Sequence, residues 1–332
     1  MASGFRPGAI VFLMKIGKKD FFLGDSDSKF NSGLHRYALL TAGCTFVLLL
    51  AGALVTSTGS SLAVPDWPLS FGKLFPEMKG GVLFEHGHRM VAGTVAFLML
   101  GLMVVTQRVE KRLWVKRLAW TAMGAILLQA VLGGVTVLLH LPTQVSVAHA
   151  GLAQIFFCLI VTLALVTSKG WMEETPGRIS SADPSLKRWA LASTIIIYFQ
   201  ILVGAVTRHS GAGLAIPDFP LSFRGIIPSD FSPLVLLQFS HTRIGAGLVL
   251  ILVNATSYRF CKNFPEEKGL FWPAAAAGLF VWLQCFLGIL IILTQKAIVP
   301  TSFHVLMGAA TLASMLILTL KSYQLFKKEE VL

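Results

Sequence analysis

The sequence predicts an all-α integral membrane protein made of two similar halves, and three observations support this prediction. Hydrophobic residues make up 55% of the chain, charged residues only 13%, and the mean hydropathy is +0.72. Soluble domains carry a much larger charged fraction. Apolar stretches recur that are long enough to cross about 30 Å of hydrocarbon. Finally, a long block of residues occurs twice.

We expect about eight membrane-spanning helices, four in each half. The predicted spans cover residues 37–57, 84–106, 118–139, 145–167, 189–207, 233–257, 270–293 and 302–320. An even number of spans in each repeat gives both repeats the same orientation. The halves are therefore expected to be two tandem four-helix bundles, related by pseudo-two-fold symmetry along the membrane normal.

The repeat is clearest in two loops. They read Gly59-Ser-Ser-Leu-Ala-Val-Pro-Asp-Trp-Pro-Leu-Ser-Phe71 and Gly211-Ala-Gly-Leu-Ala-Ile-Pro-Asp-Phe-Pro-Leu-Ser-Phe223. The offset between corresponding landmarks grows from 152 residues at these loops to 155 near the ends of the halves, which small insertions explain. The chain is therefore a duplicated membrane unit.

Basic residues predict how the chain crosses the membrane. Twenty-one of the 28 Lys and Arg residues lie in the two tails and the even-numbered connections. The positive-inside rule places these segments in the cytoplasm, or in the matrix for a mitochondrial inner-membrane protein. The predicted order is a cytoplasmic tail (1–36), a first repeat (37–168), a cytoplasmic linker (169–188), a second repeat (189–320) and a cytoplasmic tail (321–332). The net charge of +12 suits anionic lipid and does not indicate a nucleic-acid partner.

Four of the eight histidines occupy matching places in the repeats and are the candidate metal ligands. Two histidines on different helices can hold one haem iron from opposite faces. A lone histidine in an apolar helix is more often a hydrogen-bonded core residue, but a pair that occurs in both halves favours ligation. The pairs are His88 with His149, and His241 with His304. The remaining four, His35, His86, His140 and His209, are expected at the surface or the membrane interface.

Haem propionates need cationic partners near the membrane surface, and three arginines are available there. They are Arg89, Arg208 and Arg243. Arg89 directly follows His88, whereas Arg243 comes two residues after His241. At about 100° per residue, Arg89 and Arg243 are expected to leave their helices in different directions.

The sharpest difference between the repeats is Glu85 against Gln238, each three residues before the first histidine of its repeat. Residues three apart lie on one helix face. An ionisable group at this depth is costly and indicates a function. We therefore expect a reactive first bundle and a permanent cofactor in the second. The alternative is that Glu85 only caps its own helix. A di-iron site is excluded, because it needs several more inward carboxylates.

The two repeated loops are longer than most connections in compact domains. We expect them to fold over the bundle as lids, with Trp67 and Phe219 at the interface or against a ligand. Asp66 and Asp218 are expected to stabilise turn backbone, because both copies keep them. The four cysteines lie in spans or cytoplasmic connections, so no disulfide is expected.

Together these residues resemble the heme A synthase family, over nearly the whole chain from about residue 34. The motifs that carry the resemblance are Gly52-Ala-Leu-Val-Thr-Ser-Thr-Gly59, Glu85-His-Gly-His88-Arg89, Leu132-Gly-Gly-Val-Thr136, Gly204-Ala-Val-Thr-Arg208 and Gln238-Phe-Ser-His241. The resemblance implies oxidation of the C8 methyl of heme O to a formyl group by successive hydroxylations, for terminal oxidase biogenesis. Heme O synthase and terminal-oxidase assembly factors are implied as partners, and a homo-oligomer is compatible with it.

The resemblance also implies a role for each candidate. The second bundle would hold heme b through His241 and His304. The first would bind the substrate heme O and the product heme A through His88 and His149, with Glu85 acting at the reacting methyl. From their charge, we expect Arg208 and Arg243 beside heme b and Arg89 beside the substrate haem. The chain departs from the family where many members have a cysteine pair in the first loop, and where His241-Thr-Arg243 replaces His-Arg.

Two other functions stay open on the residues alone. A bis-histidine membrane cytochrome that only transfers electrons would use both histidine pairs, but it gives Glu85 no purpose. A haem transporter fits less well, because all four histidines lie near one membrane face.

Overall fold

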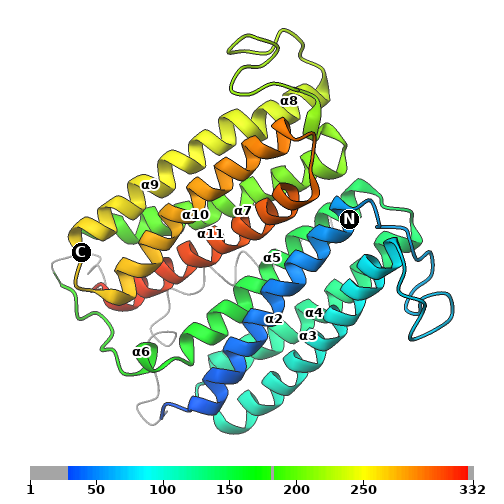
Figure 1. Ribbon diagram of the computed structural model, residues 1–332. Coiled ribbons are helices and arrows are strands. Elements are labelled where there is room, and N and C mark those ends of the chain that lie inside the picture. Colours follow the sequence, from blue (N-terminus) through cyan, green and yellow to red (C-terminus); the bar gives the residue numbers. More distant parts are fainter. Residues whose placement is uncertain (1–28, 181–182, 328–332) are drawn as a thin grey trace, which may run out of the picture.

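The computed structural model describes residues 29–180 and 183–327 (Figure 1). In this part of the chain, eight helices are long and apolar enough to cross a membrane. The predicted all-helical fold and the predicted number of spans are thus confirmed, and the protein is a multi-pass membrane protein. Most of the predicted N-terminal tail and the last residues of the predicted C-terminal tail lie outside the described residues.

Most helices begin several residues before the apolar run that predicted them, because polar residues continue a helix into the membrane interface. The sixth span is continuous but consists of three elements, α8, η3 and α9. In chain order the elements are α2 (Ser32–Ser57), α3 (Gly81–Val109), α4 (Leu113–Leu138), α5 (Thr143–Val166), α6 (Lys169–Met172), α7 (Ser185–His209), η2 (Ala212–Leu214), α8 (Pro233–Phe239), η3 (Ser240–Gly245), α9 (Ala246–Asn263), α10 (Lys268–Leu293) and α11 (Ile298–Leu325).

The long helices form two groups of four (Figure 1). In the first group α2 packs on α3, α3 on α4, α4 on α5 and α5 back on α2; α7, α9, α10 and α11 repeat this order. Each group has its own apolar core. These contacts fit two four-helix repeats, while the symmetry axis that relates them stays a prediction.

α11 and α5 join the two groups. Phe157 and Val161 of α5 pack against Ala309 and Ala313 of α11 in a third apolar cluster. Small side chains on α11 let neighbouring helices approach closely, which is how membrane helices gain packing energy. α11 also contacts α2, so it lies against both groups.

The two long connections leave the helices at the same end, which we call the loop end (Figure 1). The first loop (58–80) joins α2 to α3, and the second loop (210–232) joins α7 to α8. In the first loop the Asp66 carboxylate accepts hydrogen bonds from the N–H groups of Phe71 at 2.8 Å and Gly72 at 2.9 Å. These bonds, the one from Gly72 foremost, hold the pKa of Asp66 below its usual value.

The second loop has the same arrangement. Asp218 accepts from the N–H groups of Phe223 at 2.9 Å and Arg224 at 2.8 Å. Its pKa is likewise lowered, first by the bond from Arg224 and then by that from Phe223. The prediction that both aspartates stabilise turn backbone is confirmed.

At the opposite end, Lys321 of α11 holds the connection between the two groups. Its side chain is buried, with the residue only 5% exposed. The ammonium lies 5.5 Å from the centre of the Trp171 ring. It donates hydrogen bonds to Gly170 O at 2.9 Å, Glu174 Oε2 at 2.9 Å and Gln324 Oε1 at 3.2 Å. The segment around α6 is thereby fixed to the last helix.

We expect Lys321→Ala to destabilise the protein by about 2 kcal/mol, because it removes charge-assisted hydrogen bonds and leaves the Glu174 carboxylate without its cation. Thermal unfolding in detergent would measure the loss, and proteolysis should become faster near residue 174. Lys169→Ala is the matched control: its pair with Glu173 is exposed and contributes little. Equal unfolding temperatures for both variants would contradict this account.

We expect Asp66→Ala to loosen the first loop and leave the second loop unchanged. Hydrogen exchange at the Phe71 and Gly72 amides should accelerate. Because the folded pKa is lowered, the stabilisation is present above the unfolded pKa of about 3.9 and is lost as the pH falls through the folded value. The unaltered loop should therefore loosen only in acid. Asp218→Ala should show the mirror-image result, and uniform exchange in both loops would refute the assignment.

Candidate functional site

The structure brings the predicted histidine pairs together near the loop end. His241 of η3 and His304 of α11 face each other with ring centroids 6.4 Å apart and ring planes at 80°. Metal–imidazole nitrogen bonds are about 2 Å long, so one metal ion fits between the rings. His88 of α3 and His149 of α5 are close enough to interact electrostatically.

Each histidine pair suits a metal ion that is already coordinated by a cofactor. No group of three or more His, Cys, Asp or Glu side chains that could hold a bare metal ion occurs among residues 29–180 and 183–327. A haem needs only two protein ligands, because its macrocycle supplies the other four. The donor sets present here therefore fit haem iron.

A glycine on the preceding long helix faces each of the four imidazoles. A β-carbon at that glycine would come within 2.7–3.3 Å of the Cε1 atom of the ring, which is closer than ordinary van der Waals contact. The missing side chain is therefore what admits the imidazole. The pairs are Gly52 with His88, Gly133 with His149, Gly204 with His241, and Gly288 with His304.

Three of these glycines, Gly52, Gly133 and Gly204, belong to motifs quoted above, but their contacts with the histidines could not be predicted from the sequence. Other glycines lie a few residues after a histidine on the same helix. At Gly93 and Gly247, an added β-carbon would meet nothing within 4 Å. Gly245 and Gly308 instead make room for Gln200 and Gln284.

Those glutamines contact the histidines of the second half. Gln200 Nε2 lies 3.1 Å from His241 Nδ1 and donates to His241 O at 2.8 Å. His304 Nδ1 lies 3.1 Å from the backbone oxygen of Gln284, and its Nε2 lies 3.1 Å from Gln284 Nε2. The Gln200 amide donates to His241 Nδ1, whereas the Gln284 backbone carbonyl accepts from His304 Nδ1 and the Gln284 amide donates to His304 Nε2. These bonds fix the orientation of both rings.

The histidines of the first half are less constrained. Gln129 donates to His149 O at 2.9 Å, but Leu48 stands at the position that corresponds to Gln200. Within the described residues, the Nδ1 atoms of His88 and His149 are buried without a hydrogen-bond partner. The two halves therefore hold their imidazoles differently.

Glu85 and Gln238 fix the two loops in the same way. Glu85 Oε2 accepts the Val64 N–H at 2.8 Å, and Gln238 Oε1 accepts the N–H of Ile216, the corresponding residue. Both side chains are buried, with the residues 4% and 0% exposed. The helix-capping alternative for Glu85 is not supported, because α3 has Gly80 at its N-cap and no side-chain cap.

The arginines correct one sequence prediction. Arg89 and Arg243 were expected to point in different directions, yet both donate to the same loop carbonyls. Arg89 bonds Asp66 O at 2.7 Å and Leu69 O at 2.9 Å; Arg243 bonds the corresponding atoms, Asp218 O at 2.7 Å and Leu221 O at 2.6 Å. The reason is η3, a π-helical turn that absorbs the extra residue Thr242.

Arg89 also forms an ion pair with Glu85, the residue expected to be reactive. Its Nη2 lies 2.7 Å from Glu85 Oε1, in an ion pair whose two side chains are 16% and 5% exposed. In the second half, Gln238 instead donates to the carbonyls of Gly213 at 3.1 Å and Ile216 at 3.2 Å. The first half thus has a buried charged pair where the second has a neutral amide.

Arg208 lies between the two halves. From α7 its Nη2 donates to Ala53 O at 3.0 Å and Ser57 Oγ at 2.9 Å on α2. It also interacts electrostatically with His304. A buried cation at this place can hold an anionic group of a ligand in the second half.

The other histidines mostly stay away from the pairs. His140 is exposed, and His35 Nδ1 lies 3.1 Å from Ala164 O at the opposite end. The expected surface position is wrong for His86, which is only 6% exposed because the first loop covers it. Its Nδ1 lies 2.8 Å from Ser70 Oγ. The carbonyl of His209 accepts from Thr143 of α5 at 3.2 Å.

Comparisons with known proteins identify the family of this chain. The COX15-CtaA family model, described as cytochrome oxidase assembly protein, matches residues 76–316. The heme A synthase of Bacillus pumilus is 30% identical over 271 residues, which cover 80% of this chain and 87% of that protein. A heme A synthase of Staphylococcus aureus is 31% identical over 265 residues, 79% of this chain and 86% of its own. The resemblance noted in the sequence is confirmed, and the chain belongs to the COX15-CtaA family of cytochrome oxidase assembly proteins.

Proposed function

We propose that this membrane protein is a heme A synthase, an oxidoreductase that converts the C8 methyl of heme O to a formyl group. Its family and the names of its relatives support this function. The observation that carries the proposal is the contrast at one buried position. Glu85 and Gln238 both fix a loop beside a histidine pair, but only the first half has a carboxylate there.

We assign the substrate heme O to His88 and His149, and a resident heme b to His241 and His304. The different anchoring of the imidazoles supports this division. Rings fixed at Nδ1 suit a cofactor that stays bound, whereas rings without that bond suit a haem that must enter and leave. We expect Arg208 and Arg243 to serve the propionates of heme b, and Arg89 those of heme O.

The proposed reaction is two hydroxylations of the methyl, to the alcohol and then the geminal diol, followed by loss of water to give the formyl group. With dioxygen as co-substrate, each hydroxylation consumes one dioxygen, two electrons and two protons, inserts one oxygen atom into a C–H bond and releases the other as water. When bound, haem iron supplies the redox chemistry and heme b supplies electron transfer. Glu85 would accept a proton from the reacting carbon or stabilise positive charge there. Arg89 would hold that carboxylate in place through their ion pair, and the first loop would exclude water.

We infer that both termini are cytoplasmic and that the loop end faces the outside. The predominance of Lys and Arg in the tails and even-numbered connections supports this orientation. Heme O synthase is then the expected supplier of the substrate, and terminal-oxidase assembly factors are the expected recipients of the product.

We expect Glu85→Gln to lower heme A formation by about 100-fold, because general acid–base or electrostatic help of this kind is worth at least that much. The amide keeps an acceptor for the Val64 N–H, as Gln238 does in the second half, so the loop should stay closed. The measurement is mass analysis of haems extracted from protein made in a host that supplies heme O. Heme b content should not change.

Gln238→Glu is the matched control and should still make heme A. Undiminished heme A from Glu85→Gln would remove the carboxylate from the mechanism. Heme b alone in the unaltered protein, after confirmed supply of heme O, would favour a cytochrome that only transfers electrons.

We expect Gly204→Ala to reduce retention of heme b by about tenfold, because its β-carbon would come 2.7 Å from His241 Cε1 and displace the ring. Haem content and the absorbance spectrum after purification would measure the loss. Gly247→Ala, in the same half, adds a β-carbon that meets no atom within 4 Å and should retain heme b. Full retention by Gly204→Ala would place heme b elsewhere.

A further inference from the structure

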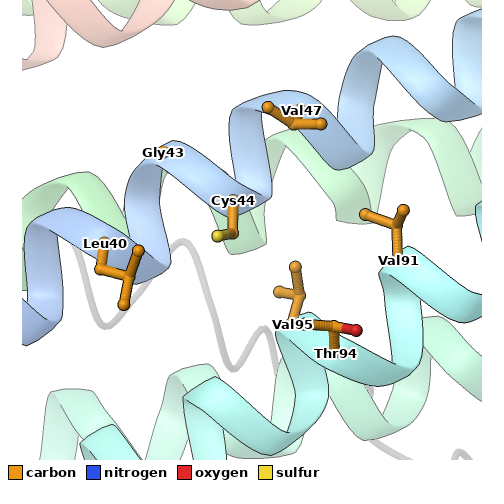
Figure 2. A pocket seen from close by; sticks show the side chains of 7 residues that line it. All are labelled: Leu40, Gly43, Cys44, Val47, Val91, Thr94 and Val95. Atoms are coloured by element: carbon orange, nitrogen blue, oxygen red, sulfur yellow. The ribbon is translucent and has the colours of Figure 1, made fainter.

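A groove of about 290 Å³ lies between α2 and α3 (Figure 2). Figure 2 shows Cys44 on α2 and Val95 on α3 pointing toward each other across it. Leu40 and Val47 are 55% and 56% exposed, so the groove opens on the outer side of the helix pair, toward lipid. Its lining, almost entirely apolar, consists of Leu40, Gly43, Cys44, Val47, Val91, Thr94 and Val95.

The groove is adjacent to the substrate site proposed above. It is formed by the same two helices that bring Gly52 against His88. Val91 lies three residues after His88 on α3, which is nearly one helical turn or about 4.5 Å along the axis. The groove therefore begins just below the histidine, on the side of the membrane interior.

Four of the seven lining residues have larger counterparts in the second half, Val95 has an identical one (Val249), and two have smaller ones, Ala192 for Leu40 and Gly245 for Val91. The repeat offset of 152 residues aligns the groove residues of α2 with α7. One extra residue in the second loop and Thr242 in η3 raise the offset to 154 between α3 and α9. At the four positions with larger counterparts, the smaller residue belongs to the half that contains Glu85. The matches are Gly43 with Ile195, Cys44 with Ile196, Val47 with Phe199, and Thr94 with Leu248.

We propose that this groove binds the isoprenoid chain of the substrate haem. The proposal rests on the function assigned above: heme O carries a long hydrocarbon chain that heme b lacks, so only the first half needs room for one. The chain would stay in contact with lipid at the open side. The small residues opposite Val95 would let it pack between the helices.

Packing, and not the hydrophobic effect, distinguishes the groove from the surrounding bilayer, because lipid tails are as apolar as the lining. The main consequence is therefore orientation. The chain leaves one edge of the macrocycle, so holding it fixes the rotation of the ring about the axis through His88 and His149. That rotation decides which methyl group faces Glu85.

The test is Gly43→Ile, which introduces the residue that the second half has at this position. A β-carbon at Gly43 meets no atom within 4 Å, so the variant should fold. Protein whose second site is filled with heme b is titrated with heme O and, separately, with further heme b. We expect heme O binding to weaken by about tenfold through lost packing, with heme b binding at the first site unchanged.

Gly124→Ile is the matched control, because Gly124 is also exposed on a spanning helix with open space around it, but on α4. It should change neither titration. Equal weakening for both haems, or none for either, would overturn the proposal. Loss of a co-purified phospholipid from Gly43→Ile, with heme O binding intact, would assign the groove to lipid instead.

A different result would contradict the proposed enzymatic function. If the unaltered protein binds heme O but makes no heme A with electrons supplied, the enzymatic assignment fails. The titrations of Gly43→Ile still decide whether the groove receives the chain.

Discussion

The positions of both histidine pairs depend on one contact that occurs four times. In each case an imidazole lies against a glycine on a neighbouring helix. Membrane helices gain little from the hydrophobic effect between themselves, so close packing and satisfied polar groups hold them together. Four glycines have no side chain at the helix surface, and a histidine ring occupies the space that a side chain would take. They are Gly52, Gly133, Gly204 and Gly288. Each histidine pair is thus set by two helix–helix contacts, which fixes where a metal between the rings must lie.

The second requirement is a closed loop over each pair. Both loops use the same parts: an aspartate that accepts two backbone N–H groups, an arginine that donates to two loop carbonyls, and a buried Glu or Gln that accepts the N–H of Val64 or Ile216. The bonds to Glu85 and Gln238 satisfy the N–H groups of Val64 and Ile216, which are buried and would otherwise have no partner. Duplication preserved these contacts, while the side chains differ at Glu85, which corresponds to Gln238, and at Leu48, which corresponds to Gln200.

Much of this architecture follows from the sequence because it depends on composition and on repetition. Apolar length predicted the spans, and the duplicated landmarks predicted the histidine pairs and the contrast between Glu85 and Gln238. What the sequence concealed depends on local geometry. The direction of Arg243 could not be derived from a regular helix, because η3 is π-helical. The partners of the histidines lie on other helices, so Gly204 and Gln200 were recognisable only once the helices were packed. Burial of His86 required the folded loop above it.

Because Glu85 both holds the first loop and is proposed to act on the substrate, loop closure and oxidation are linked. Its carboxylate holds the first loop through Val64 and is also the group proposed to act on the substrate. If the first loop is open, Glu85 lacks the hydrogen bond from the Val64 N–H. A haem bound in that state would have no carboxylate aligned with its methyl group. If Glu85 reacts as proposed, oxidation is restricted to the enclosed state, where neither water nor lipid can be attacked in place of the methyl group.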